Sequence, residues 1–387
     1  MKRGITMDFT ELTKFLDRIT VDPGVPGVDC SVYKDHKEVY RHCAGYKDVK
    51  NGKKMQGDEI FNFYSPTKIL TAAASMQLVE KGLITLETPA YDIIPEMKEM
   101  TYLKDVGDGK KEISKVTKPM TIRHLLSMTG GFDYDIHKKE IEDEKKRPDG
   151  RCPTVETVKE IIKAPLLFEP GEHWNYSLCH DIMGAIIELV SGKKLSEYYK
   201  ENIFEPLGMT ESGFYRDWSK ADRFAHQYFY NDETKHADEM TIENDHVFGT
   251  EYESAGAGLI STVNDYMKFA ETLTNMGTSP DGTRILSPDS VNEIRRNQLT
   301  EKQLPDVDWT QLKGYGYGFG VRTLLDPKKG ETLSTVGEFG WSGAAGVYIS
   351  MDPTKKITVV YAQHMRNNLE PYIHPRLRNH IYASFEK

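Results

Sequence analysis

The stretch NFYSPTKILTAAASMQLVEKG, residues 62–82, decides how the rest of this sequence is interpreted. Ser65 is a residue type preferred at helix N-caps, Pro66 suits the first helical position, and Gly82 suits the residue after a helix. Apolar residues between them recur at helical spacing and predict a buried helix over residues 66–81. These residues are Ile69, Ala72, Ala73, Met76 and Val79. The stretch therefore allows Ser65 to be an ordinary helix cap.

The same stretch also allows Ser65 to be a nucleophile. Lys68 lies three residues further on, so both side chains share one helix face and the ammonium can approach the hydroxyl. The Ser-x-x-Lys spacing alone cannot decide between the two interpretations, because the sequence contains it four times. The pairs are Ser31/Lys34, Ser65/Lys68, Ser191/Lys194 and Ser384/Lys387.

A serine site needs further parts besides a lysine. It needs N–H donors for an oxyanion and a group that returns the proton to the leaving alcohol or amine. A tyrosine can act as the base if a nearby ammonium lowers its pKa from about 10. The chain has 21 tyrosines, so composition does not choose one of them.

Composition excludes several classes of protein. The 387 residues include 59 acidic and 50 basic side chains, which give a net charge of −9 and a pI near 5.8. This balance argues against a nucleic-acid partner, which would require a basic face. The N-terminal stretch is interrupted by acidic residues and predicts an amphipathic helix rather than a signal or membrane segment. We therefore expect a cytoplasmic protein with no membrane partner, while its oligomeric state stays open.

Other catalytic patterns are missing. The four cysteines form no Cys-x-x-Cys pair, and the histidines show no metal-ligand spacing, so we expect neither a metal nor a cofactor. Cys30 and Cys43 flank a predicted turn, where they could face each other across two strands, and we expect them to be reduced thiols. The sequence GWSGA at 340–344 is one residue away from a nucleophile elbow. The glycines of GYGYGFG alternate at period two, which favours close packing of a strand over phosphate binding.

Strand-like segments lie near both ends of the chain, and the middle is helical and rich in loops. We therefore expect a mixed α/β (α+β) protein in which the two ends share one sheet. Residues 1–90 and 251–387 would form the sheet domain, and residues 91–250 would form a mostly helical lobe.

Five ordered blocks of the sequence resemble the serine β-lactamase and penicillin-binding superfamily, in particular class C β-lactamases and family VIII carboxylesterases. The resemblance covers most of the chain. The blocks are IFNFYSPTKILTAAASMQLVEKGLITLETP, TIRHLLSMTGGF, FEPGEHWNYSLCHDIMGAIIELVSGKKLSEYYKENIFEPLGM, SAGAGLISTVNDYMKF and GEFGWSGAAGVYISMDP. It implies a β-lactamase/transpeptidase-like fold, an antiparallel sheet flanked by helices plus a mostly helical lobe.

The resemblance also assigns roles to residues. It makes Ser65 the acylated nucleophile, Lys68 its partner, and Tyr176 the general base and then the general acid. Trp341-Ser342-Gly343 falls where the family has Lys-Thr-Gly, and the oxyanion hole would be the backbone N–H groups of Ser65 and Ala344.

Two positions depart from the β-lactamase pattern. Leu178 replaces the Asn of Tyr-x-Asn, so an amide that can bind a β-lactam side chain is lost. Trp341 replaces the Lys of Lys-Thr-Gly, which removes a cation able to hold a carboxylate. Both changes make the pocket more apolar, and Trp341, Ser342, Gly343 and Leu178 are the candidate substrate-binding residues.

The sequence thus predicts a serine hydrolase that cleaves carboxylic esters through an acyl-enzyme. The alternatives are a β-lactamase or D-amino-acid peptidase, an acyltransferase or transesterase, and a non-catalytic binding protein on the same scaffold. The expected partner is a small-molecule ester or amide.

Overall fold

The computed structural model describes residues 7–240 and 244–385. Within these residues, eight strands form one sheet in which every strand is antiparallel to its neighbours. In spatial order the strands are β10 (Tyr315–Tyr317), β11 (Arg322–Leu324), β12 (Phe339–Gly340), β13 (Tyr348–Asp352), β14 (Ile357–Gln363), β1 (Gly27–Lys34), β2 (Lys37–Asp48) and β3 (Lys53–Lys54). The predicted mixed α/β fold with an antiparallel sheet is therefore confirmed.

The two ends of the chain meet in the centre of this sheet. β1 pairs with β14, and the register places Val32 opposite Val359. All residues of β14 are buried, and its sequence, ITVVYAQ, is rich in the β-branched and aromatic residues that favour strands. A strand buried on both faces needs cover on both sides of the sheet.

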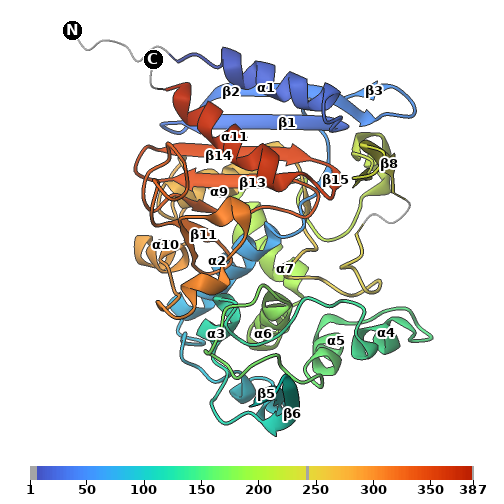
Figure 1. Cartoon of the computed structure of the whole chain (residues 1–387), viewed down its shortest axis with the longest axis vertical. Helices are drawn as coiled ribbons and strands as arrows, with labels where there is room; N and C mark the ends of the chain where they lie inside the picture. The colour runs from blue at the N-terminus through green and yellow to red at the C-terminus, as the bar shows by residue number, and fades with distance from the viewer. Residues whose placement is uncertain (1–6, 241–243, 386–387) are drawn as a thin grey trace.

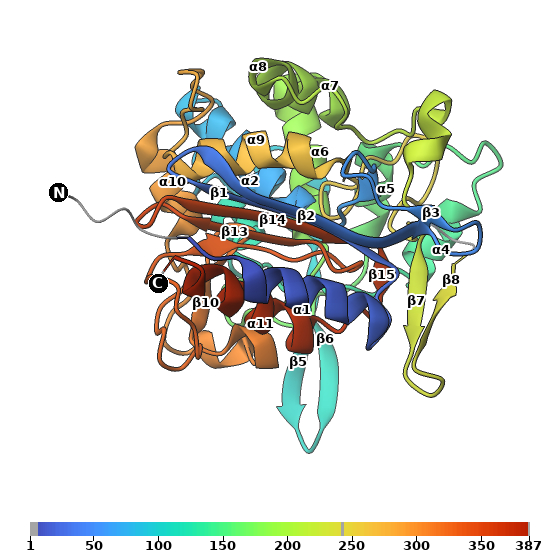
Figure 2. The same ribbon diagram turned by 90° about the horizontal axis from the view of Figure 1, so that it is seen from above.

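Helices cover both faces of this strand. α1 (Thr10–Val21) and α11 (Glu370–Ala383) lie side by side on one face, and α9 (Val263–Thr274) packs on the other face (Figures 1 and 2). α1 buries Leu12, Phe15, Leu16 and Ile19 on one side, as expected of the amphipathic helix predicted for the N-terminal stretch. The first and last parts of the described chain consequently meet, and the N–H of Asp8 donates to the carbonyl of Ser384 at 3.0 Å.

The helix predicted from the opening stretch is α2 (Thr67–Glu80), which packs against α6 (Cys179–Ser191) and α10 (Pro288–Arg295). Every residue from Thr67 to Leu78 is buried, including Lys68. A helix that is apolar on all sides belongs in the interior of a protein. The amine of Lys68 is therefore an ionisable group inside the core, and this position has consequences for its chemistry.

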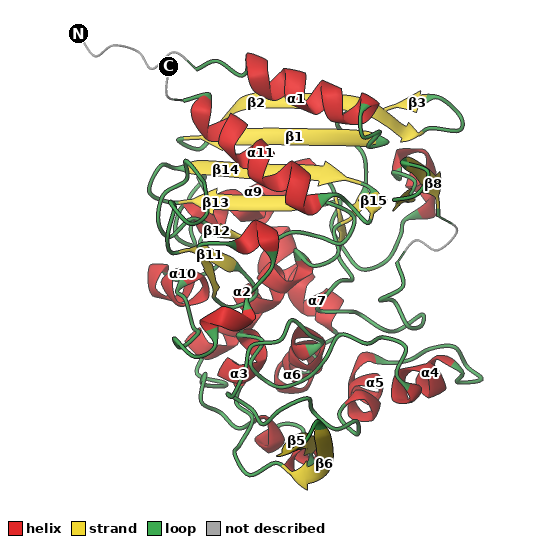
Figure 3. Ribbon diagram, in the orientation of Figure 1, coloured by secondary structure: helices red, strands yellow, loops and turns green. Residues whose placement is uncertain are grey.

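The middle of the chain contains most of the remaining helices, together with two hairpins (Figure 3). The helices are α3 (Ile122–Leu126), α4 (Lys139–Lys145), α5 (Thr154–Ile161), α6 (Cys179–Ser191), α7 (Leu195–Tyr199) and α8 (Glu205–Leu207), with α10 (Pro288–Arg295) later in the chain. The helical segments of 3₁₀ or π type are η1 (Ala90–Asp92), η2 (Pro95–Glu99), η3 (Lys200–Phe204), η4 (Trp218–Arg223), η5 (Leu304–Asp306) and η6 (Thr310–Leu312). The smaller strand pairs are β4 (Phe61–Asn62) with β9 (Ile260–Ser261), β5 (Thr101–Gly107) with β6 (Lys110–Lys115), and β7 (Tyr228–Asn231) with β8 (His236–Glu239) and β15 (Met365–Arg366).

The register of β1 and β2 corrects one sequence-based expectation. Cys30 pairs with His42 and Cys43 pairs with Asp29, so the two cysteines are not opposite each other. Adjacent residues on a strand point to opposite faces, and a register offset of one residue therefore separates the two thiols. All four cysteines are free thiols.

Candidate active site

Ser65 lies two residues before the start of α2, in a tight turn after β4. Tyr64 has a φ of 55°, a left-handed conformation that costs about 1–3 kcal/mol for a bulky residue. The buried Tyr64 side chain is held in place, because its hydroxyl donates to Gln227 at 2.7 Å and Arg366 lies over its ring. These contacts of Tyr64 therefore hold the turn that carries Ser65 in one conformation.

Ser65 does not cap the helix with its side chain. The residue at the N-cap position is Pro66, and no side-chain cap is formed there. The backbone carbonyl of Ser65 accepts from the N–H of Lys68 instead. The expectation that the Ser65 hydroxyl caps α2 is wrong, and this leaves the hydroxyl available for other partners.

Lys68 is completely buried and its Nζ has three oxygen neighbours. Nζ donates to the carbonyl of Gly256 at 2.7 Å, to the hydroxyl of Tyr134 at 3.3 Å and to Oγ of Ser65 at 3.4 Å. Burial lowers the pKa of Lys68 from 10.5 to about 7, against the opposing effect of the Asp181 charge. Lys68 can therefore be neutral, and accept a proton, at pH values just above neutrality.

The other three Ser-x-x-Lys pairs lack this arrangement. Ser31 and Lys34 lie on β1, where residues three apart face opposite sides of the sheet. Ser191 ends α6 and Lys194 lies beyond Gly192, which has left-handed backbone geometry. Lys387 lies outside the described residues. Among pairs that the structure describes in full, only Ser65/Lys68 combines a helix with a buried lysine.

Two tyrosines, Tyr176 and Tyr134, adjoin Ser65 and Lys68. Their rings are stacked, with centroids 5.2 Å apart, and Nζ of Lys68 lies 4.6 Å from the Tyr176 ring and 5.2 Å from the Tyr134 ring. Ser65 hydrogen-bonds to both phenols. Sequence reasoning identified Tyr176 but missed Tyr134, which is the second residue after the TIRHLLSMTGGF block. The position of Tyr134 close behind this block is the sequence signal that could have identified it.

The electrostatics of Tyr176 differ from the sequence-based expectation. A nearby ammonium was expected to lower its pKa, but burial raises the pKa of Tyr176 and outweighs the hydrogen bonds from Ser65 and Trp341. Burial likewise raises the pKa of Tyr134. Because both phenols stay protonated near neutral pH, Lys68 is the better proton acceptor of this group.

Trp341 directly contacts Tyr176. Its Nε1 donates to the Tyr176 hydroxyl at 3.0 Å, and the two rings are stacked with centroids 5.2 Å apart. Trp309 and Tyr317 pack around the same indole, and Trp174 packs between Tyr317 and Tyr176. The position where the resemblance places a lysine therefore belongs to an aromatic layer beside the phenol.

The candidate oxyanion donors lie on two segments that touch. A Cβ on Gly343 would lie 2.3 Å from the Phe63 carbonyl and 3.2 Å from Cδ of Pro66, so the turn at residues 343–346 packs directly on the Ser65 segment. Asn368 fixes this turn by donating to the carbonyls of Gly343 and Ala344. Within the part of the chain that the structure describes, the N–H groups of Ser65 and Ala344 donate to no protein acceptor.

Two predicted substrate-binding side chains have other partners. The hydroxyl of Ser342 donates to Glu370 on α11. Leu178 is buried at the start of α6 and lines a small recess with Phe132 and Ile161. The structure thus brings together Ser65, Lys68, Tyr176, Trp341, Gly343 and Ala344, while substrate contacts by Ser342 and Leu178 stay predictions.

Asp181 is a buried carboxylate behind Lys68 that sequence reasoning missed. It accepts from the hydroxyl of Tyr252 at 3.0 Å, from Oγ of Ser254 at 2.7 Å and from the N–H of Gly256 at 3.4 Å. A Cβ on Gly256 would lie 2.3 Å from Oδ2 of Asp181. Asp181 therefore holds in place the turn whose Gly256 carbonyl receives the ammonium of Lys68. Nothing in the local sequence marks it, because its partners lie more than 70 residues away.

Two further observations concern the described residues as a whole. No group of histidine, cysteine, aspartate and glutamate side chains among them is arranged to hold a metal ion. No helix that the structure describes is long and apolar enough to cross a membrane.

With this geometry established, comparison with known proteins identifies the relatives of the chain. The family model named Beta-lactamase matches residues 12–379. The chain belongs to the beta-lactamase family. The family predicted from the five sequence blocks is thereby confirmed.

The relatives include esterases and acyltransferases. Acyltransferase calJ of Penicillium decumbens is 28% identical over 335 residues, which cover 80% of this chain and 77% of calJ. Esterase EstB of Burkholderia gladioli is 27% identical over 334 residues, which cover 80% of this chain and 79% of EstB. Among solved structures, EstCE1, "a hydrolase with promiscuous acyltransferase activity", superposes with a TM-score of 0.79 at 23% identity and covers 98% of both chains. This superposition confirms the β-lactamase/transpeptidase-like fold.

Proposed function

We propose that this protein is a serine hydrolase that cleaves carboxylic esters through an acyl-enzyme on Ser65. The observation that carries the proposal is the contact of Trp341 with Tyr176. An indole at this position gives the site an apolar wall and no ammonium for the carboxylate of a β-lactam or peptide. An uncharged ester suits such a site.

The surroundings of Ser65 supply little free positive charge. Arg366 forms an ion pair with Asp245 at 2.9 Å, so its charge is balanced. Burial lowers the pKa of His246 to about 4, and this imidazole is therefore neutral at pH 7. The His246 ring packs edge-to-face with the Tyr134 ring and adds to the aromatic lining of the site. This supports a neutral substrate over an anionic one.

In the proposed acylation step, Oγ of Ser65 attacks the ester carbonyl carbon and its proton passes to neutral Lys68, the Nζ of which is 3.4 Å away. The carbonyl oxygen becomes an oxyanion and receives hydrogen bonds from the N–H groups of Ser65 and Ala344. The start of α2 adds to this effect, because helix N-termini favour negative charge.

Collapse of the tetrahedral intermediate breaks the bond to the alcohol oxygen. Tyr176, held by Trp341, donates its proton to this oxygen, and the Lys68 ammonium replaces that proton. A water molecule then attacks the acyl carbon and passes a proton to Lys68. The bond from this carbon to Oγ of Ser65 breaks, Oγ takes up a proton from Lys68, and the carboxylic acid is released. The sequence assigned the base role to Tyr176; with the pKa of Lys68 near 7, we assign it to Lys68.

The substrate class is tested by comparing two chromogenic substrates. We expect kcat/KM for p-nitrophenyl butyrate to exceed that for a chromogenic cephalosporin by about 100-fold, because the cephalosporin carboxylate lacks a cationic partner. Initial rates with each substrate give this ratio, and mass spectrometry of the quenched enzyme detects the acyl adduct.

Each possible result has a definite meaning. Faster turnover of the cephalosporin would make the protein a β-lactamase and contradict the ester assignment. Absence of both turnover and an adduct would favour a non-catalytic binding protein on the same scaffold.

Acyl transfer to an alcohol is the second candidate function. The name of calJ and the description of EstCE1 both include acyltransferase activity, which supports this candidate. In the same butyrate assay with added short-chain alcohol, a transferase forms the new butyrate ester faster than it forms butyric acid. A hydrolase forms mainly the acid.

We predict that Asp181→Asn moves the acid limb of ester turnover to lower pH by about one pH unit. The charge of Asp181 raises the pKa of Lys68 against the effect of burial. Loss of that charge lets Lys68 stay neutral at lower pH. The measurement is kcat/KM for p-nitrophenyl butyrate as a function of pH, because this profile reports ionisations of the free enzyme.

Asp265→Asn is the matched control for this prediction. Asp265 is also a buried carboxylate, but it accepts from Glu211 and Ser212, away from Lys68. Its variant should keep the native pH profile. If the Asp181→Asn profile also superimposes on the native one, Asp181 only stabilises the fold and has no influence on Lys68.

A further inference from the structure

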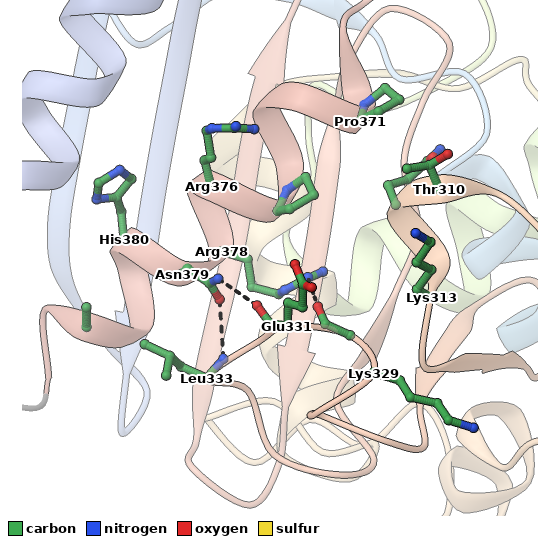
Figure 4. A pocket seen from close by; sticks show the side chains of 14 residues that line it. Thr310, Lys313, Lys329, Glu331, Leu333, Pro371, Arg376, Arg378, Asn379 and His380 are labelled. Atoms are coloured by element: carbon green, nitrogen blue, oxygen red, sulfur yellow. Dashed lines mark hydrogen bonds between the residues drawn. The ribbon is translucent and has the colours of Figure 1, made fainter.

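A groove of about 580 Å³ lies away from Ser65, on the side of the sheet that α11 covers. Its walls are α11, η6 with Lys313, and the loop that contains residues 329–333 (Figure 4). Asn379 on α11 donates to the Glu331 carbonyl at 2.8 Å and accepts from the N–H of Leu333 at 3.2 Å. These bonds tie the loop to the helix, so the groove is formed before any ligand binds.

The groove gathers positive charge in an acidic protein. Four cations line it: Lys313, Lys329, Arg376 and Arg378. Across residues 7–240 and 244–385, none of the four forms an ion pair with a carboxylate, although the chain has more acidic than basic residues. Glu331 is the one carboxylate among the described lining residues, and no cation lies within ion-pair distance of it. The groove therefore has an excess of positive charge that the described residues do not neutralise.

Arg378 forms part of the groove while being only 3% exposed. Its Nε donates to Oγ1 of Thr332 at 2.8 Å and its Nη2 is 3.4 Å from the Gly330 carbonyl. Its Cζ lies 5.3 Å from the centroid of the Tyr315 ring, and no carboxylate of the described residues forms an ion pair with it. A buried guanidinium without a carboxylate partner is costly, and a bound anion would offset this cost.

Apolar residues share the groove with these cations. Leu333, Pro371, Pro375 and Ala383 line it. Its volume lies in the range of about 300–1,000 Å³ that is typical of small-molecule sites. A matching ligand would combine an anionic group with a compact, less polar body.

We propose that this groove binds a soluble small molecule that carries a phosphate group. A phosphate monoester has three terminal oxygens that accept hydrogen bonds and close to two negative charges at neutral pH, which suits one guanidinium and flanking lysines better than a single carboxylate does. The groove residues are separate from Ser65, Lys68 and Tyr176, so this proposal does not depend on the proposed esterase function.

Isothermal titration calorimetry with the full chain tests the proposal, with inorganic phosphate and AMP as probes. We expect saturable binding of both, tighter for AMP because its nucleoside can pack on the apolar residues. Sodium acetate at matched ionic strength should give no saturable signal. Affinity should fall as sodium chloride is added, because salt screens exposed charges.

Charge-reversal variants locate the site. Lys313→Glu and Lys329→Glu should each weaken AMP binding by about tenfold, because each replaces an attraction by a repulsion. Lys328→Glu is the matched control, since Lys328 is an exposed neighbour that does not line the groove. All three positions are exposed, and thermal unfolding without ligand verifies that the variants fold.

Two results would overturn the proposal. One is the absence of saturable binding of phosphate or AMP at concentrations up to about 10 mM. A Kd above this value would be weaker than we expect of a small-molecule site of this size. The other is equal loss of binding in Lys328→Glu and in the groove variants, which would indicate a general charge effect. AMP binding without phosphate binding would assign recognition to the nucleoside and contradict the phosphate role.

Discussion

Ser65→Ala is expected to abolish ester turnover, with kcat/KM reduced by about 10⁴-fold or more. The alanine removes the atom to which the acyl group is bound, so neither the acyl-enzyme nor its hydrolysis can occur at this site. The fold should persist, because the Ser65 hydroxyl does not cap α2 and only its backbone carbonyl supports the first helical turn. The measurement combines initial rates with p-nitrophenyl butyrate and mass spectrometry of the quenched protein.

The matched control for this variant is Ser191→Ala. Ser191 also belongs to a Ser-x-x-Lys pair, but it lies at the end of α6 and accepts only a local hydrogen bond from Lys193. Its variant should retain native turnover. Ester turnover that survives in Ser65→Ala would contradict the proposed mechanism, because the nucleophile would then have to be another residue.

Lys68→Met is expected to reduce kcat/KM by about 10³-fold and to remove the rise of activity around pH 7. Methionine matches the length of the lysine side chain and is uncharged, but it cannot accept a proton from Ser65. The pKa of Lys68 is lowered to about 7 by burial, so the native enzyme gains its neutral base as pH rises through that value. A native profile without an acid limb near pH 7 would contradict the assignment of Lys68 as the base.

The same substitution tests the buried charge through stability. The pKa of Lys68 is about 7 in the folded protein, and the ordinary value of 10.5 applies to the unfolded chain. Between these values the unfolded chain binds more protons at this residue than the folded protein does. The contribution of Lys68 to the free energy of unfolding therefore rises with pH across this window, and it is least favourable below pH 7.

Urea unfolding at pH 7 and at a higher pH inside the window measures this contribution. In the native protein, Lys68 makes the free energy of unfolding rise with pH in this window, and Lys68→Met should remove this rise. Lys81→Met is the control, because Lys81 follows the same helix but is exposed and bonds Tyr198 and Asn202. An unchanged slope in Lys68→Met would mean that the pKa of Lys68 is not lowered on folding.

Much of the fold follows from short-range patterns. The helix after Ser65 was predictable because Ser-Pro at its start, apolar residues at helical spacing and Gly82 at its end are all local signals. The sheet built from both ends of the chain followed from alternating segments near each terminus. The pairing of Cys43 with Asp29 did not follow, because a register is set by how two strands meet.

Some residues of the candidate site could likewise be predicted from the sequence, and others could not. The spacing of Ser65 and Lys68 brings both side chains to one helix face, but it occurs four times in the chain, so the place of this pair in a family-like block selected it. Tyr176, Trp341 and Ala344 were found through resemblance to the family, which carries long-range information that residue spacing lacks. Tyr134 escaped because a loop tyrosine has no pattern of its own among 21 tyrosines.

By itself, the sequence determined the family, the mixed α/β class and the pair Ser65 and Lys68, because these depend on local spacing and ordered blocks. Only the tertiary structure decided the chemistry of that pair. Burial inside α2 lowers the pKa of Lys68, burial raises that of Tyr176, and Asp181 supports the Gly256 carbonyl from another helix. Desolvation and long-range hydrogen bonds depend on which distant residues surround a group, and residue order alone does not specify those neighbours.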